Sequence, residues 1–295
     1  MFTRLFGESG LSLDRLRALV EVGAHGSIVG AADGDPVRQS QYSRQIKELE
    51  DFFRVPLVER HGKGLRLTPT GRELARISRF FLLGLSNFQR GCLGEGQTYR
   101  IGANRTVIEA LLVPALAGMG AEMRLVQVRV EAVDADDVER RLHDLSLDFG
   151  VVRRADLSRP LQTAGLVAWH ARLWVPARLC RTAAEAADRW RAGELPVAWP
   201  GAELAWEGSG GRGSPALECE SFLEARAALA TGELAAPLPG FLPPGQEAGA
   251  CLEVALSAAC EGEYRLAWNP RLLRLNPHAA GWRDALIRRL TAALA

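Results

Sequence analysis

The chain has 295 residues, of which 47% are hydrophobic and 24% are charged, a length and composition typical of a globular protein of roughly two domains. It contains no run of about 18 apolar residues, and its first residues lack the apolar segment of a signal peptide, so we expect a cytoplasmic protein without a membrane partner. Five widely spaced cysteines and five scattered histidines argue against a disulfide framework, and we expect neither a metal nor another cofactor.

The net charge of +1 is unevenly distributed along the chain. Residues 1–90 hold 14 Lys and Arg against 10 Asp and Glu, whereas the remaining residues hold 22 against 25. Both lysines, Lys47 and Lys63, lie in the first part. A basic N-terminal part on a faintly acidic remainder favours a nucleic-acid partner for the N-terminal part alone.

Three helices are predicted at the start of the chain. The first spans Leu13–His25 and ends near Gly23–Gly26; its expected core residues are Leu13, Leu16, Leu19, Val20 and Val22. Ser27 can cap a short second helix, and Asp35 can cap a third that begins at Pro36. Helices separated by such short turns are typical of the helix-turn-helix.

The third helix, Pro36–Phe53, has one apolar stripe and one polar face. Tyr42, Ile46, Leu49 and Phe53 recur at i, i+4, i+7 and i+11, which predicts a buried side. The opposite side offers hydrogen-bond donors without carboxylates, which suits a major groove, where Arg or Lys reads guanine and Gln reads adenine. Taken alone, the pattern favours a solvated surface helix, but the neighbouring elements favour a DNA-reading helix. The candidate DNA-reading residues are Gln39, Ser40, Gln41, Ser43, Arg44 and Lys47.

Two short strand-like runs, Leu57–Arg60 and Leu65–Thr68, follow the third helix. They are joined by His61–Gly64, whose glycines permit the positive φ of a tight hairpin turn. A basic hairpin in this place predicts a wing, and its cationic residues can reach phosphates or a minor groove. These residues are Arg60, Lys63 and Arg66.

The segment from Gly26 to Ala75 resembles the winged helix-turn-helix of the LysR-type transcriptional regulators. The matching positions are Gly26-Ser27, Ala31-Ala32, Gln39, Ser43-Arg44-Gln45-Ile46, Leu49-Glu50, Leu57, Arg60, Leu67-Thr68 and Gly71. Asp35 stands where the family usually has leucine, and Arg38–Gln41 replaces its usual Ser-Gln-Pro-Ala, so we expect an altered turn and a different set of bases read. The resemblance covers residues 13–90 in detail and the remainder in layout.

A long helix, Pro69–Gln89, is predicted next, with Thr68 as its cap. Its heptad-like apolar stripe consists of Leu74, Ile77, Phe81, Leu85 and Phe88. The stripe can pack against the winged domain, but the resemblance implies a linker helix that pairs with its copy, which we favour. The glycine-rich stretch Arg90–Gln97 is the expected hinge.

From Tyr99 onward, strands alternate with helices, which predicts parallel pairing in a doubly wound sheet. The expected strands are Tyr99–Gly102, Leu125–Val130, Asp148–Val152, Gly165–Trp169, Leu173–Pro176 and Pro196–Trp199. The expected helices are Thr106–Met119 (interrupted by Pro114), Asp136–Leu145 (capped by Asp134 or Asp136), Thr182–Ala192, Ser221–Thr231 and Trp282–Leu294.

We therefore expect an α/β protein with an N-terminal winged helix-turn-helix, a long linker helix and a second, two-lobed α/β part. The expected boundaries are 1–68 for the DNA-binding domain, 69–97 for the linker and 98–295 for the rest. The resemblance implies a periplasmic-binding-protein-like effector domain there, with lobe one at about 98–166 and 270–295 and lobe two at about 167–269. The chain would leave lobe one near Leu166–Trp169 and return near Tyr264–Asn269.

The stretch Asn104-Arg105-Thr106, between the first strand and its helix, is a candidate anion site. Ligands of open α/β sheets bind beyond the carboxyl ends of strands, and helix N-termini attract anions. Ordinary capping by Asn104 or Thr106 explains these residues equally well. The resemblance implies a small organic effector in this place. The glycine-rich Glu207–Pro215 lacks a Gly-Lys-Ser/Thr motif and is expected to be a surface loop.

No catalytic constellation is recognisable, so we expect no enzyme. The resemblance implies a sequence-specific regulator that binds double-stranded DNA as a homodimer or homotetramer, responds to a small molecule, and has RNA polymerase as a further candidate partner. Two alternatives stay open: a regulator whose C-terminal domain has lost ligand sensing and serves assembly, and an enzyme with a DNA-binding head.

Overall fold

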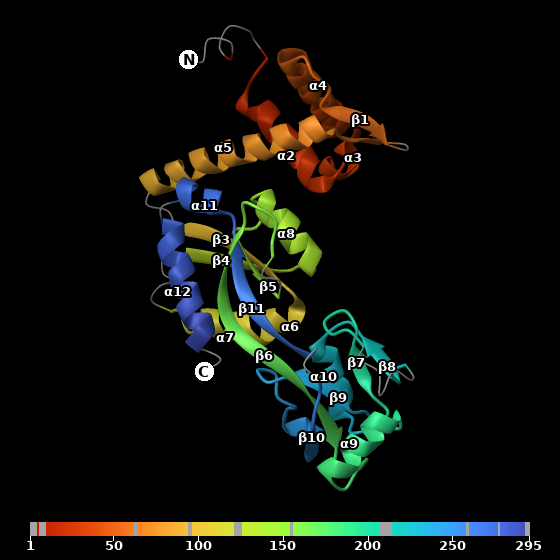
Figure 1. Ribbon diagram of the computed structural model, residues 1–295. Helices are drawn as coiled ribbons and strands as arrows, with labels where there is room; N and C mark the ends of the chain where they lie inside the picture. The colour runs from red at the N-terminus through yellow and green to blue at the C-terminus, as the bar shows by residue number, and fades with distance from the viewer. Residues whose placement is uncertain are drawn as a thin grey trace. The chain divides into compact units, whose positions relative to one another are not determined.

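The computed structural model describes residues 5, 10–61, 64–93, 96–120, 126–153, 156–206, 214–257, 260–276 and 278–292. The chain forms two compact units (Figure 1). The first comprises Met1–Gln97 with Asp144–Ser146 and Arg271–Pro277, and the second comprises the other residues. None of the described helices is long and apolar enough to cross a lipid bilayer.

The first unit contains three short helices, a hairpin and one long helix. These elements are α2 (Leu13–His25), α3 (Ile28–Ala31), α4 (Pro36–Phe53), β1 (Val58–His61), β2 (Gly64–Leu67) and α5 (Pro69–Leu93). The predicted caps are confirmed, because Ser27 accepts a hydrogen bond from the Gly30 amide and Asp35 accepts one from the Val37 amide. The β1 and β2 strands pair antiparallel, each displaced by one residue from the predicted boundaries.

Most of the predicted stripe residues form the core of the first unit. Leu16, Leu19 and Val22 of α2 pack against Tyr42, Ile46 and Leu49 of α4, with Phe53 partly buried beside them. The prediction was wrong for Leu13, which is 52% exposed, and Val20 is only half-buried. The buried residues of α2, Leu16, Ala18, Leu19 and Val22, share one side of the helix, and Leu13 in its first turn lies off that side.

The long helix α5 begins as predicted but ends later. Thr68 caps it by accepting a hydrogen bond from the Gly71 amide. The helix continues through Gly91 to Leu93, four residues into the predicted hinge Arg90–Gln97, and β3 begins at Gln97. Residues 94 and 95 of the predicted hinge lie outside the described residues. A single glycine in a helix costs only about 1 kcal/mol, too little to end a helix of this length.

The second unit begins with a strand–helix–strand–helix–strand run. Its elements are β3 (Gln97–Ala103), α6 (Arg105–Val107), the π-helix η1 (Ile108–Leu112), α7 (Val113–Ala117), β4 (Val126–Ala132), α8 (Ala135–His143) and β5 (Phe149–Val152). The predicted helix Thr106–Met119 is therefore divided, because Pro114 has no amide proton to donate at the start of α7. The predicted end of α8 was two residues too late, since Leu145 has a φ of 55°.

Later elements complete two lobes of this unit. They are β6 (Gln162–Pro176), α9 (Ala183–Ala192), β7 (Ala198–Pro200), β8 (Leu217–Cys219), α10 (Phe222–Ala230), β9 (Ala236–Pro239), η3 (Gln246–Ala248), β10 (Cys251–Ala255), β11 (Glu261–Trp268), α11 (Pro270–Leu275) and α12 (His278–Ala292). Thr182 and Ser221, at which two of the predicted helices begin, cap α9 and α10. Residues 293 and 294 of the last predicted helix lie outside the described residues, as do 121–125, which include the predicted strand start at Leu125.

The main sheet has the order β10-β6-β11-β5-β3-β4, with β9 also paired to β6. It is mixed: β3 and β5 run parallel, as predicted, whereas β11 is antiparallel to both β5 and β6. The predicted strands Gly165–Trp169 and Leu173–Pro176 are one strand, because β11 pairs with its first part and β9 and β10 pair with its last part. Figure 1 shows β6 and β11 running side by side between the two lobes.

Asp148 joins the starts of β3 and β5. Its carboxylate accepts a hydrogen bond from the Arg100 amide at 2.8 Å, and its own amide donates to the Arg100 carbonyl oxygen at 3.0 Å. Burial raises the pKa of the Asp148 carboxyl to about 6. The folded chain therefore holds a proton on this residue in a range where the unfolded chain has lost it.

We expect Asp148→Asn to flatten the dependence of stability on pH. Because the folded-state pKa is the higher one, the wild-type free energy of unfolding should fall as pH rises from about 4 to 6. Asparagine keeps an oxygen acceptor but cannot ionise, so above pH 6 the variant should be more stable by about 1–3 kcal/mol, at 1.36 kcal/mol per pKa unit. Urea titrations from pH 3.5 to 7.5 measure this difference. Parallel curves for the two proteins across that range would contradict the expectation.

Candidate DNA interface and inter-lobe site

The polar face of α4 is available to a partner in the first unit. Ser40, Gln41, Ser43, Arg44 and Lys47 are exposed and Gln39 is half-buried, on the side opposite the buried Tyr42, Ile46 and Leu49. Arg44 approaches Glu48 at 3.8 Å, but 77% of its side chain is exposed. An ion pair as exposed as this one contributes little to stability, so Arg44 can exchange it for another partner.

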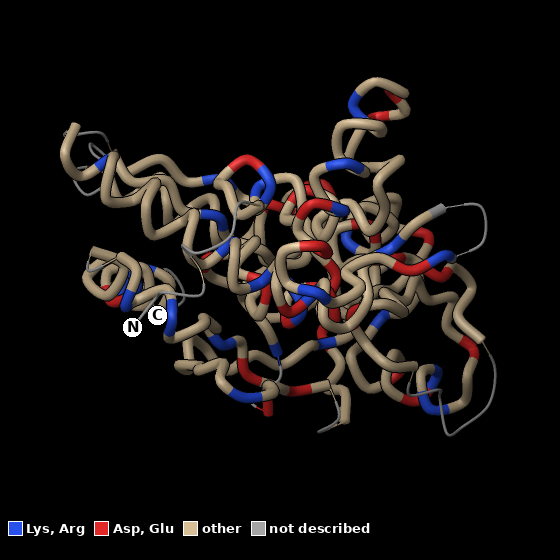
Figure 2. The backbone as a smooth tube through the Cα atoms, turned by 90° about the horizontal axis from the view of Figure 1, so that it is seen from above, with Lys and Arg blue, Asp and Glu red and all other residues tan. Residues whose placement is uncertain are grey.

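Arg38 is a further cation on α4 that the sequence interpretation missed. It lies in the first turn, is exposed, and approaches Asp33 at 3.3 Å. The first residues of a recognition helix contact base edges, so its position alone could have identified it. Basic and acidic residues are interspersed over the described backbone (Figure 2). The arrangement of donors on α4 therefore distinguishes this surface better than net charge does.

The hairpin presents its cations in two different states. Arg60 is exposed, whereas Arg66 forms an ion pair of 3.0 Å with Glu59, its cross-strand partner. A contact from Arg66 to a phosphate would have to share or replace that pair. The predicted contact from Lys63 lies outside the described residues.

The apolar stripe of α5 is largely uncovered. Leu74 packs against the core of the first unit, but Ile77, Phe81, Leu85 and Phe88 are 53%, 49%, 43% and 73% exposed. The winged domain therefore accounts for only the first member of the stripe. The other four form a continuous apolar surface on α5, which we call the α5 stripe.

In the second unit, the structure brings Asn104, Arg105 and Thr106 to the start of α6. The Asn104 side chain caps the helix by accepting a hydrogen bond from the Val107 amide at 2.8 Å. Arg105 is exposed, whereas Thr106 is completely buried. Of the three, Arg105 is the most exposed, whereas Asn104 and Thr106 have hydrogen-bond partners within the chain.

The partner of Thr106 is a carboxylate that the sequence interpretation missed. Thr106 Oγ1 donates a hydrogen bond of 2.9 Å to Glu203 Oε2, and the Phe222 amide donates one of 3.1 Å to the same oxygen. Arg153 donates a hydrogen bond from Nη1 to the carbonyl oxygen of Glu203. Burial raises the pKa of the Glu203 carboxyl, while these hydrogen bonds and the charge of Arg153 act in the opposite direction.

Aromatic side chains pack around Arg153, the cation next to Glu203. The Arg153 guanidinium lies 4.2 Å from the centroid of the Trp169 ring. Trp169 in turn packs 5.8 Å from Tyr264 and 6.2 Å from Phe222, measured between ring centroids. Arg153 follows β5 directly, so the rule that sites form beyond strand ends could have identified it.

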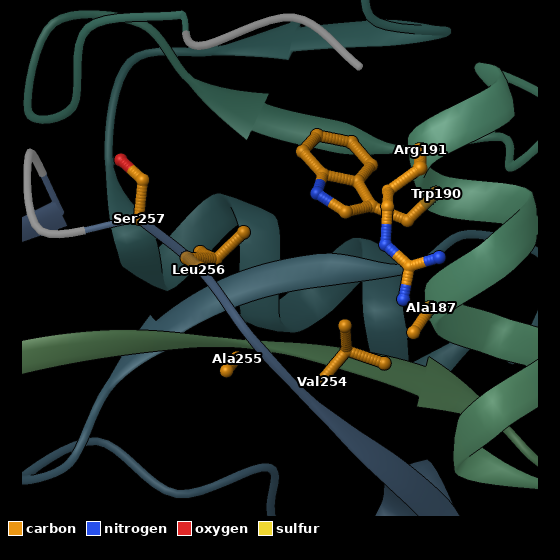
Figure 3. Close-up of a pocket in the computed structure, with 7 residues that line it drawn as sticks. All are labelled: Ala187, Trp190, Arg191, Val254, Ala255, Leu256 and Ser257. Carbon is orange, nitrogen blue, oxygen red and sulfur yellow. The ribbon is translucent and has the colours of Figure 1, made fainter. Parts of the chain in front are cut away.

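A separate cavity lies in lobe two, away from this junction. Its volume is about 520 Å³, and its lining residues are Ala187, Trp190, Arg191, Val254, Ala255, Leu256 and Ser257. Figure 3 shows Trp190 and Arg191 of α9 facing the segment from Val254 to Ser257. Arg191 also pairs with Asp188.

Neither unit contains a recognisable metal centre within its described residues. No group of three or more His, Cys, Asp or Glu side chains there could hold a metal ion. The predicted glycine-rich loop Glu207–Pro215 falls mostly on 207–213, outside the described residues.

Comparison with known families and curated proteins gives consistent matches. The model of the bacterial regulatory helix-turn-helix proteins of the lysR family matches residues 13–72. The HTH-type transcriptional regulator GbpR from Rhizobium radiobacter is 29% identical over 150 residues, which cover 49% of this chain and 50% of that protein. The "Probable hydrogen peroxide-inducible genes activator" from Mycobacterium xenopi is 30% identical over 161 residues, 53% of this chain and 82% of that protein. The chain matches about half the length of GbpR and of PcaQ, another regulator of this kind.

Solved structures share the fold over nearly the full chain. Full-length OxyR from Pseudomonas aeruginosa has a TM-score of 0.62 at 17% identity, covering 95% of this chain and 94% of that one. LysG from Corynebacterium glutamicum, with its effector Arg bound, has a TM-score of 0.61 at 16% identity, covering 96% and 99%. CbnR in complex with its target DNA has a TM-score of 0.55 at 16% identity, covering 96% and 100%.

Proposed function

The chain belongs to the lysR family of bacterial regulatory helix-turn-helix proteins, and on this premise we propose that it is a sequence-specific DNA-binding transcriptional regulator. The observation that carries the proposal is the exposed face of α4, which presents Ser40, Ser43, Arg44 and Lys47 opposite a buried stripe. The family match over residues 13–72 includes the whole of this helix. A DNA partner implies a cytoplasmic protein, and we propose no enzymatic activity, because its relatives are named as a transcriptional regulator and as a genes activator.

We assign the roles of the segments accordingly. Residues 1–68 bind DNA, 69–97 connect and dimerise, and 98–295 form the two-lobed sensing part. In the first segment, α4 enters the major groove and the hairpin contacts the backbone. Gln39 and Gln41 are further hydrogen-bond donors to DNA on α4. The hairpin contributes three cationic residues to the DNA contact: Arg60, Lys63 and Arg66.

The α5 stripe pairs with the same stripe of a second copy. Ile77, Phe81, Leu85 and Phe88 are spaced for a helix seam and carry no charge, which makes the surface self-complementary. A two-fold dimer also presents two α4 helices to two half-sites, the arrangement in which helix-turn-helix proteins read DNA. Leu74 continues the seam at its N-terminal end.

The small-molecule site lies at the junction of the lobes, next to Asn104, Arg105 and Thr106. The exposed Arg105 supplies a cation at the start of α6. One observation favours a second candidate function. The hydrogen bond from Thr106 to Glu203 occupies the junction with the chain's own side chains, as expected of a regulator that uses this part for assembly alone. The two differ in whether any metabolite raises the melting temperature of the protein.

We expect Arg44→Ala and Arg60→Ala to weaken DNA binding in different ways. Both variants lose one positive charge, but Arg44 lies on the reading face and Arg60 on the hairpin. Loss of a base contact should cost about 1–3 kcal/mol on the selected site and lower the ratio of specific to non-specific affinity. Loss of a phosphate contact should weaken all sequences alike and reduce the salt slope by about one.

The measurement is a salt titration of each variant on a site selected from random DNA and on a scrambled sequence. Ile46→Ala is the folding control. Its side chain is buried, so the variant should lose DNA binding because the fold is destabilised. An unchanged specificity ratio for Arg44→Ala would remove α4 from the reading role.

A further inference from the structure

The Glu203 carboxylate is held as a bound anion would be held. One of its oxygens accepts from the Thr106 hydroxyl of lobe one and from the Phe222 amide, which belongs to the first residue of α10 in lobe two. A hydroxyl, a helix-terminal amide and a neighbouring guanidinium are the groups that proteins use for free carboxylates. The residue is only 8% exposed, so its carboxylate is largely removed from solvent.

The backbone around Glu203 fixes the carboxylate in advance. The amides of Glu203 and Leu204 both donate to the Pro200 carbonyl oxygen, at 2.9 and 2.8 Å. The Leu204 carbonyl oxygen accepts a hydrogen bond of 2.8 Å from the buried Trp199 ring. Arg153 donates to the Glu203 carbonyl oxygen from the lobe-one side. An anion held on such a turn loses little freedom on binding, so a free competitor is at a disadvantage.

The two donors belong to different lobes. Thr106 and Glu203 are separated by 97 positions in the sequence, yet their side chains meet in the buried junction. The Trp169 ring beside them has an indole nitrogen that is buried without a hydrogen-bond partner in the described part of the chain. The junction therefore contains polar groups at its centre. Glu203 supplies the anion there, and Thr106 of lobe one and the Phe222 amide of lobe two both bind it.

We propose that the Glu203 carboxylate is an internal ligand, which occupies the anion position between the lobes and excludes a free carboxylate from it. An external effector of the native chain must then bind beside this contact or displace Glu203. Removing the carboxylate should convert the junction into a site for a small monocarboxylate. The inference rests on the proposed function, because it concerns the junction that is proposed to sense a small molecule. Its test measures acetate binding and does not involve DNA.

Acetate is the matched probe, because Glu203→Ala removes one methylene group and one carboxylate, the size of an acetate ion. We expect sodium acetate to raise the melting temperature of full-length Glu203→Ala in a saturable way, at ionic strength held constant with sodium chloride. At an acetate concentration of ten times the Kd, the folding equilibrium constant should rise about tenfold. The wild-type protein should show no saturable response.

Two further variants identify the place where acetate binds. Glu203→Gln fills the same space with a neutral amide and should not respond to acetate. Glu203→Ala combined with Thr106→Val lacks the lobe-one donor and should lose the response. A Glu203→Ala chain that refolds only with acetate supports the proposal; one that refolds at no acetate concentration overturns it.

A saturable response of the wild-type protein, or an equal response to chloride, also overturns the proposal. Binding of the wild-type chain to its selected DNA is measured separately. Failure of that binding speaks against the regulator function and leaves the acetate result intact.

Discussion

Gly71→Ala is expected to destabilise the first unit strongly while the stability of the second unit stays unchanged. A Cβ atom at this position would lie 2.1 Å from the Leu57 carbonyl oxygen, a backbone atom. That oxygen also accepts a hydrogen bond of 3.0 Å from the Thr68 amide, and the Leu57 amide donates one of 2.6 Å to Glu50 Oε1. Because Leu57 is anchored on both sides and fully buried, it cannot retreat, and we expect a loss of about 3 kcal/mol or more.

Two optical signals separate the units in this experiment. All seven tryptophans lie at position 169 or later, so their fluorescence follows the second unit, whereas helical circular dichroism follows both. In urea, Gly71→Ala should lose part of its helical signal early with no change in the fluorescence transition. Gly91→Ala is the matched control on the same helix, since its Cβ would meet nothing within 4 Å. It should be neutral or stabilising by up to about 1 kcal/mol. Coincident unfolding of Gly71→Ala and wild type would contradict the expectation.

Local chemistry made the first unit predictable from its sequence. Each cap at Ser27, Asp35 and Thr68 is decided by residues within three positions, and all three caps are present. The apolar stripe of α4 needs only the helical period. Where the prediction was wrong, at Leu13 and at the end of the long helix, it concerned the ends of helices, at which small energy differences decide.

The second unit depends on contacts between residues far apart in the sequence. The strand β9, Ala236–Pro239, escaped detection because its two prolines are unusual in a strand; β9 nonetheless pairs with the end of β6. The continuity of β6 through His170 depends on partners from β11, β9 and β10. No sequence pattern joins Glu203 to Thr106, because their contact exists only once both lobes have formed. The position of Thr106 after β3 was predictable, whereas the hydrogen bond from its hydroxyl to Glu203 was not.

Phe81→Glu is expected to separate the proposed dimer into monomers. Phe81 lies in the middle of the α5 stripe, between Ile77 and Leu85, and is 49% exposed in the single chain. Two-fold symmetry introduces the change twice, so half of a phenylalanine's burial in each copy amounts to about 1.5–3 kcal/mol in total. That loss corresponds to a dimer Kd about 10- to 100-fold higher. The substitution should not unfold the chain, because Phe81 is absent from the buried core of the first unit.

Sedimentation equilibrium over a range of protein concentrations measures the effect. Gln89→Glu is the control, since it adds the same charge to an exposed position of α5 outside the stripe, and it should leave the dimer Kd within a few-fold of wild type. If the stripe is the seam, Phe81→Glu should also lose the gain in affinity that two correctly spaced half-sites give over one, while its affinity for a single half-site is kept. Loss of this gain together with an unchanged single-site affinity is expected only if the dimer joins two α4 helices. An unfolded variant would instead lose its affinity for one half-site as well as for two. An oligomer of unchanged mass in Phe81→Glu, at concentrations where wild type is dimeric, would place the interface elsewhere.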